Sequence, residues 1–262
     1  MKNKPRKFEC GAATDTGKVR LENEDSYLVQ PETGVWAVAD GMGGHEAGSL
    51  ASNVVVDALR KIAEPVSVTD LLTRCRERLA AANRRLLEIA EERGGIIIGA
   101  TVAALLAFEG YYACVWSGDS RIYLVRHGRI RQLSRDHTEV AELLAEGVLT
   151  SEEAQTWPRR NVITRAVGVH HDLDLEVSQG LLQKDDLFVI CSDGLTTHVS
   201  DDEILDATRG ETPQGACDAL VALTNERGAF DNVTVVIARY APHGSTIVFA
   251  QPAHAFAQSE HG

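Results

Sequence analysis

One stretch near the N-terminus holds side chains that suit a hard divalent cation. Arg20 is followed by the acidic pair Glu24-Asp25, and Asp40 follows the apolar run 35–39. The glycine after Asp40 lets the backbone bend and approach a ligand closely. Mg²⁺ and Mn²⁺ prefer carboxylate, carbonyl and water oxygens to sulfur or a cage of histidines. Taken singly, an Asp-Gly pair is usually a turn and a Glu-Asp pair a solvated surface. Together they predict an oxygen-rich metal site.

Three further aspartates stand beside apolar runs. Asp119 and Asp193 each follow such a run, and Asp231 stands just before the run 233–237. If this last run is antiparallel to its neighbours, its start lies beside their ends, and these three carboxylates meet Asp40 on one edge of a β core. Carboxylates so close together repel one another unless cations neutralise them. We therefore expect a metal site rather than four separate turn or cap residues.

The elements that must position these residues differ in their periodicity. Apolar spacings of three and four predict two adjacent helices after Asp40, the second opening near residue 69 and ending before Gly94-Gly95. Other runs read as strands, at 8–14, 35–39, 101–108, 111–117, 121–126, 129–133, 173–179, 187–191 and 233–240, and 26–29 is a short apolar segment. Further helices are expected within 136–160, near 201–208 and at 212–226. Helix pairs beside an antiparallel meander predict an α+β fold, a central antiparallel β-sandwich flanked by helix pairs.

Length and composition indicate one globular domain. The chain has 262 residues, of which 44% are hydrophobic and 24% charged, and it shows no internal repeat or low-complexity linker. We place the domain at residues 8–240, after a flexible, basic N-terminus at 1–7. A mobile tail is expected at 241–262, where 247–249 suggests an edge strand.

Charge and cysteine content exclude several classes of function. A formal net charge of −12 argues against nucleic acid as the main partner, but bound cations would still allow a phosphorylated substrate. The five cysteines include no Cys-x-x-Cys and none has an arginine six residues downstream, so they predict free thiols in a reducing cytoplasm and no cysteine-nucleophile phosphatase loop. No apolar run approaches the roughly 20 residues of a membrane span. P-loop, calcium-loop and zinc-protease motifs are absent.

Seven ordered motifs resemble those of the PP2C-type metal-dependent protein serine/threonine phosphatases, most of all the stand-alone bacterial type. They lie at residues 20–25 (RLENED), 39–44 (ADGMGG), 99–101 (GAT), 118–121 (GDSR), 164–168 (TRAVG), 192–195 (SDGL) and 231–232 (DN). The resemblance covers roughly residues 8 to 240. The family's fold is a β-sandwich flanked by helix pairs, which agrees with the layered arrangement expected above.

The resemblance implies a role for each candidate residue. Asp40 would bridge two Mg²⁺ or Mn²⁺ ions, and the carbonyl of Gly41 would be a further ligand. Asp193 and Asp231 would hold the first ion. Arg20 would bind the substrate phosphate.

Three other acidic residues complete the implied site. Glu24 would orient waters around the second ion, and Asp25 would support the same cluster. Asp119, together with Asp193, would bind a third, weaker ion. Met42 stands where eukaryotic relatives have a histidine that acts as general acid, so the source of the leaving-group proton is open.

Residues 138–163 match the family's variable flap beside the active site. Arg159 and Arg160 lie in this segment and are therefore candidate substrate contacts.

The implied reaction is hydrolysis of phosphoserine and phosphothreonine by a water activated between two cations, without a covalent phosphoenzyme. The partners would be phosphorylated proteins and the serine/threonine kinase that the enzyme opposes, and we expect a cytoplasmic monomer. Two alternatives compete with this hypothesis. A phosphatase-like binding module would be expected to lack one or more of the carboxylates, and none is missing. A metal-dependent nuclease is disfavoured by the acidic composition.

Overall fold

Two antiparallel sheets lie face to face in the computed structural model, which describes residues 7–44 and 46–242. One sheet has the strand order β1 (Phe8–Asp15), β11 (Val233–Tyr240), β10 (Leu187–Cys191), β7 (Arg121–Arg126) and β8 (Arg129–Gln132). The other has the order β2 (Asp25–Gln30), β3 (Val35–Met42), β5 (Val102–Phe108), β6 (Tyr111–Ser117) and β9 (Glu176–Leu181). The short strand β4 (Gly99–Ala100) pairs with β3.

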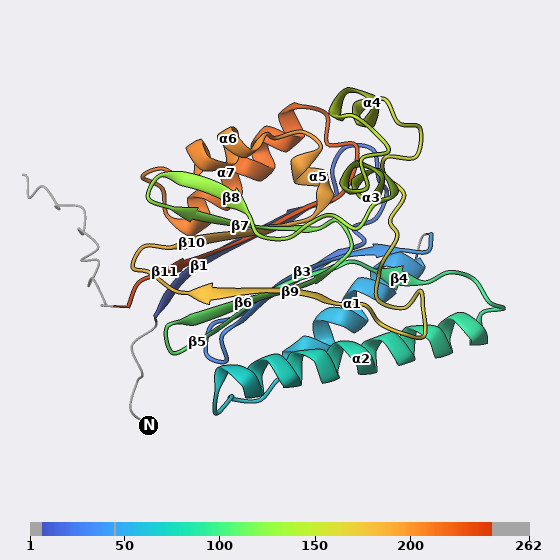
Figure 1. Ribbon diagram of the computed structural model, residues 1–262, viewed down its shortest axis with the longest axis horizontal. Coiled ribbons are helices and arrows are strands. Elements are labelled where there is room, and N and C mark those ends of the chain that lie inside the picture. Colours follow the sequence, from blue (N-terminus) through green and yellow to red (C-terminus); the bar gives the residue numbers. More distant parts are fainter. Residues whose placement is uncertain (1–6, 45, 243–262) are drawn as a thin grey trace, which may run out of the picture.

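Helices cover the outer face of each sheet (Figure 1). The sheet that contains β3 carries α1 (Glu46–Arg60) and α2 (Val68–Glu92), and the sheet that contains β11 carries α5 (Asp193–Thr196), α6 (Asp201–Ala207) and α7 (Pro213–Glu226). The predicted fold class, an antiparallel sandwich between helices, is confirmed.

The layers follow from the alternation of side chains along each strand. In β3, Val35, Ala37 and Ala39 point to the cluster beneath α1 and α2, whereas Trp36 and Val38 belong to the cluster between the sheets. All five are fully buried. Because successive side chains of a strand point to opposite faces, a strand that is apolar throughout must lie between two covered surfaces. The continuous apolar run 35–39 is therefore explained by its central layer.

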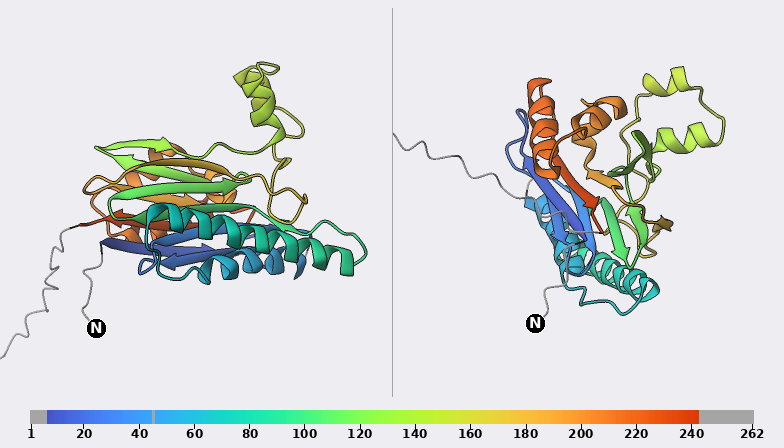
Figure 2. Two further views of the ribbon diagram at one scale, coloured as in Figure 1. Left: turned by 60° about the horizontal axis from the view of Figure 1, so that its bottom comes forward. Right: turned by 90° about the vertical axis from the view of Figure 1, so that its left-hand side faces the viewer.

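Segment 138–163, which we call the flap, stands at one end of the sandwich (Figure 2). It contains α3 (Glu139–Ala145) and α4 (Ser151–Gln155). Thr138 caps α3 by accepting the N–H of Ala141, and Thr150 opens α4 with a capping box. Neither helix has a fully buried residue.

Several sequence-based boundaries were wrong. The strand expected at 173–179 is β9 at Glu176–Leu181, because its register is set by pairing with β6, while Leu173 and Leu175 pack against the cluster beneath α1 and α2. The helices α4 and α5 were not predicted, being only one turn long. The expected terminal segments at 1–6 and 243–262, including the edge strand at 247–249, lie outside the described residues. Within the part of the chain that is described, no helix is long and apolar enough to cross a membrane.

Candidate metal centre

Five aspartates from the two sheets meet at one end of the sandwich. Asp25 in β2 lies directly opposite Asp40 in β3. Asp119 follows β6 by two residues, Asp193 opens α5 directly behind β10, and Asp231 stands two residues before β11. β10 and β11 are antiparallel, with Cys191 opposite Val235. The start of β11 therefore lies beside the end of β10, which was the condition for the predicted gathering.

The carboxylates are close enough to oppose one another's ionisation. Burial is the main cause that raises the pKa of Asp40 well above its ordinary value, followed by the charges of Asp25, Asp193, Asp119 and Asp231. Burial likewise raises the pKa of Asp25 to about 7 and that of Asp119 to about 8. It also raises the pKa of Asp193, with the charge of Asp231 as the next cause. Each of these carboxyl groups therefore resists ionisation unless positive charge lies nearby.

Two buried carboxylate oxygens have no hydrogen-bond partner among the described residues. The Oδ2 atom of Asp25 accepts the hydroxyl of Ser192 at 2.8 Å, but its Oδ1 atom is unpaired. The Oδ1 atom of Asp119 is also buried and unpaired. Leaving a buried acceptor unsatisfied costs roughly 1–3 kcal/mol, and more when it is charged. Such oxygens are suitable ligands for hard cations, so the residues present fit Mg²⁺ or Mn²⁺.

Arg20 lies at the edge of this cluster but is bound to one of its members. Its Nη2 atom donates to the Oδ2 atom of Asp231 at 2.7 Å, and this hydrogen bond is the main cause that raises the pKa of Arg20. Both side chains are partly exposed. Within residues 7–44 and 46–242, no group of three or more His, Cys, Asp or Glu side chains already has the spacing to hold an ion. Asp231 is thus the one carboxylate of the cluster that is paired with Arg20.

Glu24 and Gly41 lie against the first turn of α1. The N–H of Gly41 donates to the backbone oxygen of Glu24 at 3.1 Å. A Cβ on Gly41 would stand 1.9 Å from the backbone oxygen of Gly48, and a Cβ on Gly48 would stand 2.6 Å from the Glu24 carboxylate. Both glycines are therefore required by close packing.

Asp40 lies within its strand rather than at the tip, contrary to the prediction. β3 continues through Gly41 and Met42 because these residues pair with Ala100 and Gly99 of β4. The Asp-Gly pair is consequently not a turn.

Asn232 was not predicted as a site residue, yet it holds the loop that carries Arg20 and Glu24. Its side-chain oxygen accepts the N–H of Glu24 at 2.8 Å. Its amide nitrogen donates to the backbone oxygens of Thr16 and Glu22, each at 2.9 Å. The only signal in the sequence was its position next to Asp231.

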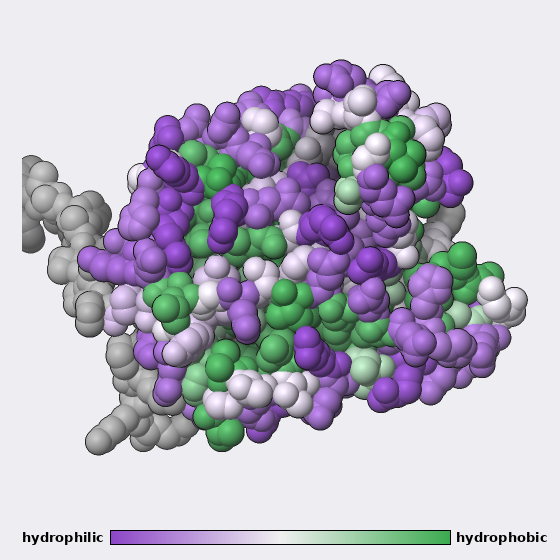
Figure 3. Space-filling model, in the orientation of Figure 1, coloured by the Kyte–Doolittle hydropathy of each residue, from purple (hydrophilic) through white to green (hydrophobic). Residues whose placement is uncertain are grey.

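A cavity of about 390 Å³ lies between the flap and the carboxylates. Asp119 and Asp193 form part of its wall, and Val140, Leu144 and Arg160 of the flap form another part. Figure 3 shows hydrophobic surface over this part of the flap, where Leu144 is 38% exposed. The cavity thus has carboxylates and Arg121 on the side of the sandwich, and apolar side chains and Arg160 on the side of the flap.

The two flap arginines differ in their surroundings. The Nη2 atom of Arg159 is 2.9 Å from a carboxylate oxygen of Glu139. The Nη1 atom of Arg160 donates to the backbone oxygen of Gln155 at 2.9 Å, and no carboxylate of the described residues is within ion-pair distance of it. Of these two flap arginines, only Arg160 lines the cavity that contains Asp119.

Comparison with known protein families gives a match over residues 17–214 to the model described as protein phosphatase 2C. The chain belongs to the protein phosphatase 2C family. This agrees with the resemblance drawn from the seven motifs, all but the last of which lie within the matched region.

Several phosphatases of this family are similar to the chain. The serine/threonine protein phosphatase PstP of Mycobacterium tuberculosis is 36% identical over 230 residues, which are 87% of this chain but 44% of PstP. The chain therefore spans less than half the length of that relative. Among solved structures, PppA, a regulatory component of the type VI secretion system in Pseudomonas aeruginosa, has a TM-score of 0.83 and 39% identity over 88% of this chain and 97% of PppA.

A manganese-bound relative bears on the cofactor. The catalytic domain of PstP, solved in complex with two manganese ions, has a TM-score of 0.80 and 34% identity over 88% of this chain and 97% of that structure.

Proposed function

We propose that this chain is a metal-dependent enzyme that hydrolyses phosphoserine and phosphothreonine in proteins. The observation that carries the proposal is the cluster of five aspartates, in which the buried Asp25 and Asp119 have unpaired oxygens, beside the guanidinium of Arg20. A phosphate ester needs positive charge around its oxygens, and this cluster can hold that charge as cations.

The residues that would hold Mg²⁺ or Mn²⁺ are Asp40, Asp193, Asp231, Asp25, Glu24, Asp119 and the carbonyl oxygen of Gly41. When bound, two such ions would supply an activated water at neutral pH and neutralise charge on the phosphoryl group. Asp119 and Asp193 would hold a third ion, and the charge of Asp193 is one of the causes that raise the pKa of Asp119. The manganese ions of the PstP structure support this cofactor class.

Arg20 would bind the substrate phosphate. An arginine presents paired N–H donors that match two oxygens of a phosphate. Its present partner, Asp231, is one of the proposed metal ligands. We infer that Asp231 turns to an ion when one is bound, which frees the guanidinium for phosphate.

Neither Met42 nor the buried cysteines suit a role in proton or phosphoryl transfer. Met42 has no proton to give, so the leaving serine or threonine oxygen would take its proton from water or from another residue. Burial raises the pKa of Cys75, Cys191 and Cys217 to about 12. These thiols stay protonated and are poor nucleophiles, which supports direct transfer of the phosphoryl group to water.

The cavity beneath the flap would receive the polypeptide on one side of the phosphorylated residue. Its apolar wall of Val140 and Leu144 suits a hydrophobic side chain of the substrate, and Arg160 suits an acidic one. We propose Arg160 rather than Arg159 as the substrate contact, because Arg159 is already paired with Glu139.

The physiological partners would be phosphorylated proteins and a serine/threonine kinase whose action the enzyme reverses. We propose that the chain acts as a monomer in the cytoplasm. The net charge of −12 disfavours nucleic acid as a substrate, because each phosphate of a nucleic acid would be repelled.

Hydrolysis of a phosphothreonine peptide by the purified protein tests the proposal. We expect release of phosphate with added Mn²⁺ and none with EDTA, and loss of turnover in Asp40→Asn and Asp193→Asn. An exposed aspartate, in Asp172→Asn, is the matched control and should keep full activity. Manganese binding without turnover by the wild type would refute the enzyme assignment and favour a phosphoprotein-binding module. Efficient cleavage of nucleic acid alone would favour a nuclease.

A further inference from the structure

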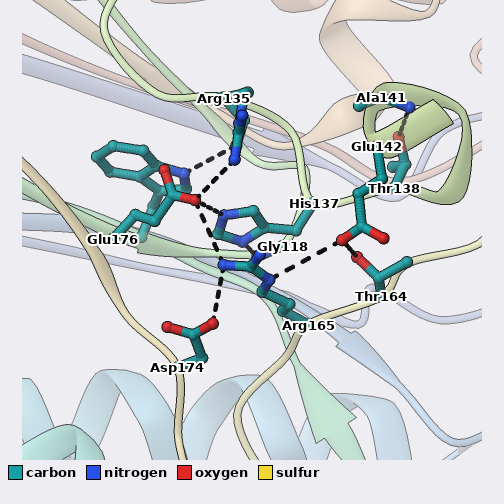
Figure 4. Close-up of polar contacts among 11 residues, drawn as sticks. Gly118, Arg135, His137, Thr138, Ala141, Glu142, Thr164, Arg165, Asp174 and Glu176 are labelled. Carbon is teal, nitrogen blue, oxygen red and sulfur yellow. Dashed lines mark hydrogen bonds and ion pairs between the residues drawn. The ribbon is translucent and has the colours of Figure 1, made fainter. Parts of the chain in front are cut away.

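His137 lies where the flap joins the sandwich. It is the residue before Thr138, which caps α3, and its side chain is 1% exposed. The ring stacks on Trp116 of β6, with ring centres 6.3 Å apart and planes 18° apart. Figure 4 shows the ring surrounded by polar groups from the flap base, β9 and the loop after β6. No motif used for the proposed function includes this histidine.

On one side, His137 holds the backbone that carries Asp119. Its Nδ1 atom accepts the backbone N–H of Gly118 at 3.1 Å, and the backbone N–H of His137 donates to the backbone oxygen of Gly118 at 3.0 Å. Gly118 has a φ of +111°, and a Cβ there would stand 2.6 Å from the Thr101 side chain. The loop is thus fixed between Thr101 and the imidazole, one residue before Asp119.

The same loop is connected to Asp40. The hydroxyls of Ser120 and Thr101 are 2.7 Å apart, and Thr101 accepts the N–H of Asp40 through its hydroxyl at 3.0 Å. His137 is therefore linked to Asp40 by its hydrogen bonds to Gly118, the backbone of residues 118–120 and the two hydrogen bonds of Thr101. Such outer partners fix the direction of metal-ligating side chains.

On the other side, His137 holds both ends of the flap. Its backbone oxygen accepts the N–H of Thr164 at 2.9 Å, and Thr138 forms a β-bridge with Ile163. The Nε2 atom lies 3.1 Å from a carboxylate oxygen of Glu176, a close contact that is not aligned as a hydrogen bond. Arg165 contacts that same oxygen at 3.3 Å.

A second carboxylate completes the link from Arg165 to α3. The Nε atom of Arg165 lies 3.9 Å from Glu142 of α3. Glu142 also accepts the hydroxyl of Thr164 at 2.8 Å. The contacts of Glu176 thus continue into the flap helix.

We propose that His137 is a positioning residue with two separate arms: its Nδ1 atom fixes the Gly118–Asp119 loop, and its Nε2 atom, through Glu176, fixes the base of the flap. Because Nδ1 accepts a hydrogen bond, it carries no proton, and the ring is the neutral tautomer with the proton on Nε2. The first arm rests on the proposed function, since it serves Asp119 as a ligand of the third ion.

Two substitutions separate the arms. In His137→Asn the side-chain amide can occupy the position of Nδ1 and accept the N–H of Gly118, but it does not extend to Glu176. In His137→Gln the amide extends toward Glu176 and no acceptor remains at the Nδ1 position. His127→Asn, at an exposed hairpin position with a positive φ of 52°, is the matched control, because asparagine tolerates that conformation.

Each arm has a readout other than turnover. Calorimetric titration with Mn²⁺ measures the affinity of the weakest-binding ion. Limited trypsin digestion in EDTA measures the rate of cleavage after Arg159 and Arg160. We expect His137→Gln to weaken the third ion on the order of 10-fold or more while the flap stays protected. His137→Asn should keep that affinity within about threefold but be cleaved faster.

Thermal unfolding of all variants distinguishes positioning from a merely structural role. If affinity and cleavage change together in both variants, in step with the melting temperature, the two-arm proposal is wrong. It is also wrong if neither variant differs from His127→Asn. A wild type that binds no third ion refutes the Asp119 arm. Absence of phosphatase activity in the wild type would refute the proposed function instead, and the digestion would still test the flap arm.

Discussion

Replacing Asp25 by asparagine should stabilise the metal-free protein. Asp25 is buried opposite Asp40, with one oxygen bound to the Ser192 hydroxyl and the other unpaired. Asparagine has nearly the same shape, so its oxygen can keep the bond to Ser192. Its amide N–H groups would then point from the position of the unpaired oxygen toward the neighbouring carboxylates. The substitution therefore removes one charge from the cluster without leaving a cavity.

The size of the effect follows from the pKa of Asp25, which is 3.8 in an unfolded chain and about 7 in the fold. Between these values the folded state binds more protons than the unfolded state, so wild-type stability falls as the pH rises through this window. The difference is about three pH units at about 1.4 kcal/mol each. Asp25→Asn should therefore gain on the order of 4 kcal/mol in free energy of unfolding at pH 8 and about 2 kcal/mol at pH 5.

Urea unfolding of the EDTA-treated proteins at pH 5 and pH 8 measures this gain. Saturating Mn²⁺ should reduce or reverse it at pH 8, because the wild type then gains a ligand that the variant has lost. Asp172→Asn, at an exposed site, should show no gain. An equal gain at both pH values, or a loss of stability at pH 8, would refute the argument from buried charge.

Three further substitutions test other contacts. Arg160→Ala should raise KM for an acidic phosphopeptide about 10-fold, the value of one lost charged contact, and should leave hydrolysis of p-nitrophenyl phosphate unchanged. Arg159→Ala should change neither reaction. Equal effects of the two substitutions would contradict the assignment of the cavity as the substrate site. Asp186→Ala should cost about 3–5 kcal/mol in chemical unfolding, since the fully buried carboxylate is 2.6 Å from Arg126, without changing kcat of the folded enzyme. Asn232→Ala should weaken Mn²⁺ binding in calorimetry on the order of 10-fold, and unchanged affinity would show that its three hydrogen bonds do not position the ligands.

Residues whose role depends on local pattern were predictable from the sequence. The bounds of β10 and β11 were predicted without error, because both are largely apolar runs with an aspartate two residues from one end. The antiparallel arrangement then implied that Asp193 and Asp231 lie side by side.

Contacts that exist only in the folded chain were not predictable. The bond from Arg20 to Asp231 joins residues 211 positions apart, and Asn232 acts on backbone atoms that have no sequence signature. The two-residue strand β4 extends β3 past Asp40, and so short an element has no periodicity to detect. His137 belongs to the same class, since a single buried histidine has no pattern that distinguishes it from core packing.

The division of the carboxylates between the two sheets has a consequence for folding. Asp25, Asp40 and Asp119 come from one sheet, and Asp193 and Asp231 from the other, so neither sheet alone can bind the ions with full strength. Asp231 stands just before β11, the last strand of the described residues. Its contact with Arg20 closes a loop of about two hundred residues, and closing so long a loop is costly in chain entropy. A nascent chain that has not yet released β11 from the ribosome therefore has no complete centre. Recovery of manganese affinity during refolding would report the docking of the two sheets. The bound ions would stabilise only the state in which both sheets are docked.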